Sequence, residues 1–222
     1  MDAIILAGGK GLRMDSDLPK ALVEVDREPI LFEQLNRLEG KVDSVMISIG
    51  YKAEEIEFAL IDNYLSNGFE NILVSAEKKP LGTAGALKYA LTQFKKIKKE
   101  LSPHVLVFNC DDLTDIDIDK IKKIKYNTIC LANPTLPFGL PHLCGKYIKG
   151  FKEKPKMEDL WVSCGWYVLN KNLDIDLPDK GSLEKDVFPE MYLRHYKHKG
   201  YWFPLNDLKS VQEFEKTKIK LS

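Results

Sequence analysis

Short apolar runs alternate with amphipathic stretches through the first half of the chain. A continuous apolar run bounded by turn-forming residues is typical of a strand buried in a parallel sheet. Such runs lie at residues 3–7, 44–49, 72–75 and 104–109. Apolar residues recur at helical spacing between them, at residues 30–38, 54–65 and 84–94. This alternation predicts an α/β fold, a Rossmann-like and mostly parallel sheet with helices on both faces.

The second half of the chain is less regular. Its apolar runs predict strands at residues 128–132, 147–151 and 165–169. Prolines and glycines interrupt the stretch between the first two of these runs, at Pro134, Pro137, Gly139 and Pro141. We expect these strands to form a mixed addition that closes over one side of the ligand cleft. Ser182 is expected to cap a short helix at residues 183–188, and residues 207–216 a final helix.

Composition narrows the class of protein. The 222 residues, 44% of them apolar, are enough for one domain with a full core. The 33 basic residues balance 33 acidic ones, so the net charge points neither to nucleic acid nor to a membrane surface. No apolar stretch approaches the ~20 residues of a membrane span. The N-terminus carries no secretory signal, so we expect the protein to be cytoplasmic.

The four cysteines are widely separated and form no C-x-x-C pair, so a zinc site is not expected. Cys110 and Cys130 lie in apolar runs, and Cys164 precedes one. We interpret these three as small buried hydrophobic residues rather than as a disulfide framework.

A glycine-rich loop follows the first predicted strand, in the segment LAGGKGLRM at residues 6–14. Glycines let backbone N–H groups approach phosphates closely. Arg13 and Lys20 add two cations within reach of the loop, which favours a polyphosphate ligand. The spacing fits neither a Walker A loop nor a dinucleotide-binding fingerprint.

This segment resembles the signature LAGGxGTRLxP…PKxLxPV of the sugar-phosphate nucleotidyltransferases, with PKALVEV at residues 19–25 as its second part. Leu12 departs from the usual threonine. The resemblance implies the nucleotide-diphospho-sugar transferase fold. It also implies that Arg13 clamps the leaving pyrophosphate and that Lys20 neutralises the α-phosphate. The loop residues that would bind the nucleotide are Leu6, Ala7, Gly8, Gly9 and Gly11.

The segment EKKPLGTAGAL at residues 77–87 resembles the base-recognition loop of the same family, most closely in its GDP-mannose-forming branch. The resemblance implies that Glu77 reads the base edge and that Gly82 and Thr83 contact the nucleotide. A carboxylate only accepts hydrogen bonds. Because guanine offers two donors on its Watson–Crick edge and uracil only one, Glu77 favours guanine. Gly82 and Gly85 are expected to let the backbone approach a flat ligand.

Carboxylates follow the strand at residues 104–109, where ligands bind in open α/β sheets. The resemblance implies that Asp111 holds Mg²⁺, an ion that prefers oxygen ligands. The acidic run after it and the segment HKGYWFPLND at residues 198–207 are similar to the glucose-1-phosphate cytidylyltransferase branch. In that alignment Asn206 takes the place of a second metal-binding aspartate, and Asp207 follows it. The resemblance thus implies Asn206 or, after a one-residue shift, Asp207 as the second metal ligand, and Asp207 could instead cap the last helix.

The segment FKEKP at residues 151–155 matches the F-x-E-K-P segment of the family. It implies that Glu153 binds sugar hydroxyls and that Lys154 contacts the phosphate of the sugar. Residues 163–168 resemble the strand N-x-G-x-Y, in which Gly165 would let the sugar approach. Trp166 and Tyr167 are expected in the core.

Together these segments predict a sugar-1-phosphate nucleotidyltransferase that makes an NDP-sugar and pyrophosphate from a nucleoside triphosphate and a sugar 1-phosphate. Residues 1–125 would bind the nucleotide and residues 126–222 the sugar. GTP is favoured by Glu77, and UTP or CTP is the alternative. Two other functions stay open, a non-catalytic sugar-nucleotide-binding relative and a phosphocholine cytidylyltransferase. The sequence leaves the sugar and the oligomeric state open.

Overall fold

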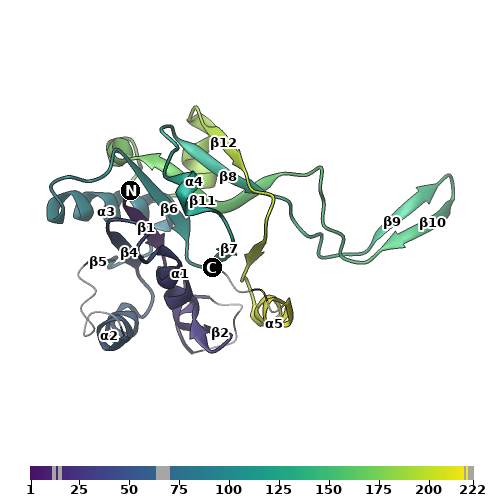
Figure 1. Cartoon of the computed structure of the whole chain (residues 1–222), viewed down its shortest axis with the longest axis horizontal. Helices are drawn as coiled ribbons and strands as arrows, with labels where there is room; N and C mark the ends of the chain where they lie inside the picture. Colours follow the sequence, from purple (N-terminus) through teal and green to yellow (C-terminus); the bar gives the residue numbers. More distant parts are fainter. Residues whose placement is uncertain (12–13, 15–16, 64–70, 218, 220–222) are drawn as a thin grey trace.

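The computed structural model describes residues 1–11, 14, 17–63, 71–217 and 219 (Figure 1). Its centre is a seven-stranded sheet in the order β12-β8-β11-β6-β1-β4-β5. The strands are β1 (Ala3–Leu6), β4 (Val45–Ile49), β5 (Ile72–Ala76), β6 (His104–Asn109), β8 (Thr128–Ala132), β11 (Val162–Asn170) and β12 (Arg194–Lys197). β6, β1, β4 and β5 run parallel to one another, while β11 is antiparallel to both β6 and β8. The mostly parallel sheet is confirmed.

Helices cover both faces of the sheet, as predicted. The helices are α1 (Ile30–Leu38), α2 (Ala53–Asn63), α3 (Gly82–Ile97), α4 (Ile118–Ile121) and α5 (Leu208–Thr217). Consecutive strand residues face opposite sides, so Ile5 packs with α1 and α2 in one buried cluster and Ile4 packs with α3 in the other. These two clusters make the sheet a rigid platform for the loops at its edge.

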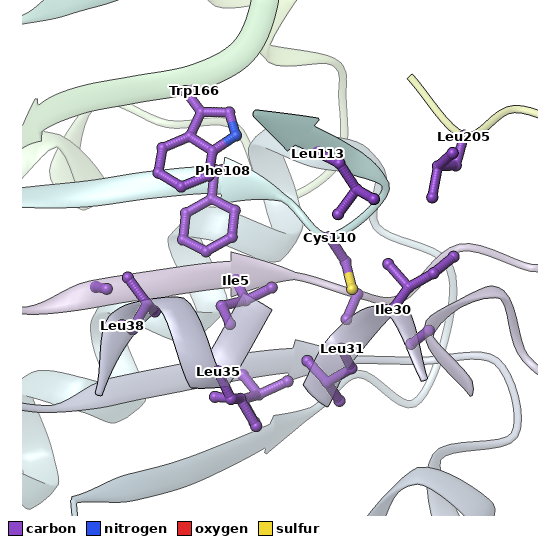
Figure 2. Packing of buried hydrophobic residues seen from close by; sticks show 14 of the residues in the cluster. Ile5, Ile30, Leu31, Leu35, Leu38, Phe108, Cys110, Leu113, Trp166 and Leu205 are labelled. Carbon is purple, nitrogen blue, oxygen red and sulfur yellow. The ribbon is translucent and has the colours of Figure 1, made fainter. Parts of the chain in front are cut away.

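The face that α1 covers is packed mainly by aliphatic side chains, with Phe108 and Trp166 among them (Figure 2). Phe108 of β6 and Trp166 of β11 are fully buried and stacked, with ring centroids 4.1 Å apart and an angle of 11° between the rings. Tyr167 faces the opposite cluster. Trp166 and Tyr167 are thus core residues, as expected. Cys110, Cys130 and Cys164 are buried free thiols, and Cys144 is exposed.

Strands of the second half differ from the expectation. We expected them to close over the cleft, but β8, β11 and β12 extend the central sheet. β9 (Leu140–Cys144) and β10 (Tyr147–Lys152) form a separate hairpin that projects from the body of the protein (Figure 1). β9 was missed because Pro141 lies inside it. Proline is tolerated there because the hairpin has free edges.

The remaining elements are short. β2 (Glu24–Val25) pairs with β3 (Glu28–Pro29), and β7 (Asp112–Thr114) pairs with β13 (Trp202–Pro204). Single helical turns occur at η1 (Lys20–Leu22), η3 (Lys171–Ile175), η4 (Leu183–Val187) and η5 (Phe188–Glu190). The Ser182 hydroxyl accepts a hydrogen bond from the Lys185 amide at 3.3 Å, which confirms the predicted cap. Among the helices of the described residues, none is long and apolar enough to cross a bilayer.

Candidate active site

A cavity of about 880 Å³ opens at the carboxyl ends of the parallel strands. The loops after β1, β4, β5 and β6 all line it, because parallel strands bring these ends to one edge of the sheet. Most residues predicted for the nucleotide and the metal meet in this cavity. They are Leu6, Ala7, Gly8, Gly9, Gly11, Lys20, Glu77, Gly82, Thr83, Asp111 and Asn206. Arg13 and Leu12 lie outside the described residues.

Lys20 and Asp111 form an ion pair inside the cavity, although 91 positions separate them in the chain. Lys20 begins the single turn η1, and Asp111 follows β6. The Cys110 amide donates to the Leu6 carbonyl at 3.0 Å, which holds the end of β6 beside the glycine loop. The structure therefore places the two predicted charged residues together at the point where the two loops meet.

Asn206 and Asp207 have different surroundings. The Leu205 amide donates to the Asp111 carbonyl at 2.9 Å, and Asn206, the next residue, lines the cavity with Asp111. The Asp207 carboxylate instead accepts from the Ser210 amide at 2.8 Å and caps the first turn of α5. Of the two alternatives left by the sequence, Asn206 is the residue in the cavity.

Asp112 is a buried carboxylate behind the cavity that sequence reasoning did not single out. It accepts hydrogen bonds from the Trp202 indole at 2.8 Å and from the Asn109 amide at 3.0 Å. Burial and the neighbouring charge of Asp111 raise the pKa of Asp112 to about 7. This carboxylate therefore links β13 to the end of β6, on either side of the cavity residues Asp111 and Asn206 in the chain.

Glu77 lies at the end of β5 in a tight niche. Its carboxylate accepts a hydrogen bond from the Leu81 amide at 3.2 Å. A Cβ at Gly50, which follows β4, would lie 2.5 Å from Oε1 and 2.9 Å from Cγ of Glu77. Partial burial raises the pKa of Glu77 above its ordinary value. Gly50 thus leaves the space that holds the Glu77 side chain in place, a role the sequence did not reveal.

Two glycines after Glu77 make a close contact that the sequence did not reveal. A Cβ at Gly82 would lie 2.3 Å from the Gly181 carbonyl oxygen, and one at Gly85 would lie 2.4 Å from that of Asp179. These glycines therefore admit the backbone of residues 179–181, and their predicted approach to a flat ligand stays a prediction. Thr83 also lines the cavity, and its hydroxyl accepts from the Leu183 amide at 2.8 Å.

Positive charge dominates the lining. Among the described residues, five lysines line the cavity against two carboxylates, those of Glu77 and Asp111; the lysines are Lys10, Lys20, Lys52, Lys78 and Lys79. Of these lysines, Lys20 is the one whose role the sequence implied. The others lie directly after β1, β4 and β5, so their position at carboxyl ends of parallel strands is the signal that could have found them. This excess of cations suits a polyphosphate.

The residues predicted for the sugar lie outside this cavity lining. The Lys154 ammonium pairs with Glu213 of α5 at 2.5 Å, and Glu153 is exposed at the base of the β9–β10 hairpin. Gly165 is buried with a φ of +73°, and a Cβ there would lie 1.8 Å from the Asp112 carboxylate. Gly165 therefore makes room for the Asp112 carboxylate, and its predicted contact with the sugar stays a prediction.

Residues 2–214 match the family described as nucleotidyl transferase. The chain is 34% identical over 208 residues to D-glycero-alpha-D-manno-heptose 1-phosphate guanylyltransferase of Campylobacter jejuni, covering 89% of this chain and 87% of that protein. The corresponding Aneurinibacillus thermoaerophilus protein is 32% identical over 211 residues, covering 87% and 86%. The fold is shared with the crystal structure of HddC from Yersinia pseudotuberculosis complexed with GMP-PN, at 24% identity and a TM-score of 0.76, over 97% and 98% of the two chains.

Proposed function

This chain belongs to the nucleotidyl transferase family, and we propose that it transfers GMP from GTP to a sugar 1-phosphate, releasing pyrophosphate. Its relatives named for D-glycero-alpha-D-manno-heptose 1-phosphate make that sugar phosphate the first candidate substrate. A relative named for mannose 1-phosphate makes that compound the second. The observation that carries the proposal is the cavity itself, which combines a lysine-rich wall, a glycine loop, and Glu77 and Asp111 at separate strand ends.

Glu77 supports guanine as the base. Its carboxylate can accept hydrogen bonds from both donors on the Watson–Crick edge of guanine. Uracil has one donor there, so one carboxylate oxygen would lack a partner. Cytosine would place an acceptor of its own against a carboxylate oxygen. One carboxylate oxygen already accepts from the Leu81 amide, which fixes the orientation of the side chain. A fixed acceptor pair of this kind discriminates strongly, because an unmatched buried polar group is costly.

The transfer needs positioning and charge neutralisation more than proton transfer. A sugar phosphate oxygen is already ionised near neutral pH, so it can attack the α-phosphorus without a general base. A new phosphorus–oxygen bond forms as the bond to pyrophosphate breaks in line with it. The Lys20 ammonium would offset negative charge on the α-phosphate, and Arg13 would do so on the leaving pyrophosphate. Lys10, Lys52, Lys78 and Lys79 would attract the triphosphate.

Asp111 and Asn206 fit a Mg²⁺ site. Both are oxygen donors on the cavity wall, and the contact of the Lys20 ammonium with Asp111 shows that this carboxylate accepts a cation. One carboxylate and one amide suit Mg²⁺, which is commonly held by few protein ligands together with substrate phosphates. When bound there, Mg²⁺ would supply positive charge that stabilises the phosphates in the transition state.

For the sugar end of the site, we propose that Glu153 binds the sugar hydroxyls and that Lys154 contacts the phosphate of the sugar. Residues 1–125 would then carry the nucleotide and residues 126–222 the sugar. For Lys154 to serve, its pairing with Glu213 must open when the sugar phosphate arrives. We also propose a cytoplasmic location, since all four cysteines are free thiols, as suits a reducing compartment.

The test is pyrophosphate release with each of the four nucleoside triphosphates, each paired with a panel of sugar 1-phosphates and Mg²⁺. We expect GTP with a manno-configured sugar 1-phosphate to be the best pair. Asp111→Asn should lose this activity, while Asp119→Asn, an exposed aspartate of α4, should keep it. Binding of GTP without pyrophosphate release from any pair would instead identify a non-catalytic relative.

A further inference from the structure

The β9–β10 hairpin carries apolar side chains that nothing in the described protein covers. Leu143 and Ile148 are directly paired across its two strands and are 67% and 64% exposed. Tyr147 and Phe151 are 78% and 63% exposed. An isolated two-stranded hairpin is only marginally stable in water, and exposed apolar patches commonly mark interaction sites. These features suggest that the hairpin gains its stability from contact with another surface.

The hairpin is also basic. Lys146, Lys149 and Lys152 lie on it or in its turn, and no carboxylate occurs between residues 135 and 152. Two hairpins packed on each other would bring like charges together, which is unfavourable. The surface that the hairpin fits must therefore offer both apolar area and negative charge.

The outer face of α2 has this composition. Glu54, Phe58, Ile61 and Asp62 stand at positions i, i+4, i+7 and i+8, so they share one stripe of the helix. Phe58 is 72% and Ile61 54% exposed, whereas Ile56 and Leu60 on the opposite stripe are buried. The helix carries four carboxylates, those of Glu54, Glu55, Glu57 and Asp62, and no cation. Its outer face thus complements the hairpin in both charge and polarity.

The hairpin and α2 lie at opposite ends of the molecule (Figure 1). A hairpin therefore cannot reach the α2 of its own chain while it projects as it does. We propose that the hairpin of one copy docks on the outer face of α2 of a second copy, in a two-fold dimer that makes this contact twice. Residues Tyr51 and Lys52 of the candidate active site directly precede α2, so the docked hairpin would lie near the mouth of the partner's cavity.

Oligomeric state gives the first test, and it does not depend on the proposed activity. We expect the protein to sediment as a dimer. Leu143→Ser and Ile148→Ser on the hairpin, and Phe58→Ser on α2, should each raise the dimer dissociation constant at least about tenfold, because each removes an apolar side chain from both contacts. Ile175→Ser, at another exposed isoleucine (78%), is the matched control and should leave the dimer intact.

Dissociation should also increase with salt, since the contact pairs basic with acidic side chains. A wild-type protein that is monomeric at all concentrations would refute the proposal. So would a dimer that survives both hairpin substitutions.

Cross-linking gives the second test, because Cys144 is the exposed cysteine at the end of β9 and the other three are buried. A tagged Phe58→Cys/Cys144→Ser variant is mixed with untagged wild-type protein and oxidised. We expect a disulfide-linked heterodimer, and none when an Ile175→Cys/Cys144→Ser variant replaces the first. A wild-type dimer linked through Cys144 on both copies would show hairpin-on-hairpin packing and overturn the proposal. A disulfide formed within one chain of the Phe58→Cys single variant would overturn it in favour of a hairpin that folds back.

Discussion

Gly50→Ala should damage GTP selection without unfolding the protein. The φ of Gly50 lies outside the left-handed region, so the backbone accepts alanine there. The added methyl group would lie 2.5 Å from Oε1 and 2.9 Å from Cγ of Glu77. To regain ordinary contact near 3.5 Å, the Glu77 carboxylate must retreat by roughly 1 Å. Because this carboxylate is the end of a flexible side chain, the fold can absorb the shift, but the base-reading acceptor loses its position.

A misplacement of about 1 Å in a binding site can lower the rate about a hundredfold. We therefore expect kcat/KM for GTP to fall about a hundredfold, equivalent to about 2.7 kcal/mol of transition-state binding. The preference for GTP over UTP should shrink with it. Steady-state pyrophosphate release with both nucleotides measures these changes, and thermal unfolding measures stability, which should change by less than about 1 kcal/mol.

Gly150→Ala is the matched control. Gly150 lies in β10, and a Cβ there would meet only the Cβ of His142, at an ordinary 3.7 Å. This variant should keep wild-type kinetics. A Gly50→Ala protein with unchanged kcat/KM for GTP would refute the role assigned to Glu77. A large loss of stability would show instead that the niche supports the fold.

Three further predictions concern the carboxylates and the core. Asp111→Asn should lower pyrophosphate release at least about a hundredfold, because it removes the charge that pairs with Lys20 and is proposed to hold Mg²⁺, and circular dichroism should show an intact fold. Asp112 has a pKa raised to about 7 from an ordinary 3.8, so the folded protein binds this proton more tightly than the unfolded chain. Asp112 therefore makes the free energy of unfolding fall as pH rises from about 4 to about 7. Urea unfolding across this range should show a weaker dependence of that free energy on pH for Asp112→Asn than for the wild type. Trp166→Ala should cost about 3–5 kcal/mol of unfolding free energy, because Trp166 is fully buried against Phe108, and equilibrium unfolding in urea measures this loss.

Sequence periodicity predicted the central architecture well. The strands at residues 44–49, 72–75 and 104–109 and the helices expected in the first half are all present, with boundaries that differ by at most three residues where the structure describes them. Buried strands and half-buried helices must carry apolar residues at fixed spacing, so a short stretch of sequence is enough to predict each of these elements. The positions of β12, β8 and β11 in the sheet could not be predicted from local sequence patterns, because strand order depends on which strand edges meet in space.

Glu77, Lys20 and Asp111 could be found from the sequence because each belongs to a short segment directly after a strand or beside the glycine loop. Their position at the carboxyl end of a parallel sheet then brings them to one cavity. At Gly165, Gly82 and Gly85, the sequence shows that a Cβ is missing but not which atom fills its place. In the structure that place is taken by Asp112 or by the backbone of residues 179–181.

The sequence by itself determined the alternation of strands and helices, the glycine loop, and the chemical character of the residues at the strand ends. Only the tertiary structure decided that Asn206 rather than Asp207 lines the cavity with Asp111, that Gly50 shapes the niche of Glu77, and that the hairpin projects. The reason is physical. Hydrophobic spacing and turn chemistry act between neighbours in the chain, whereas each of these decisions depends on contacts between residues far apart in it.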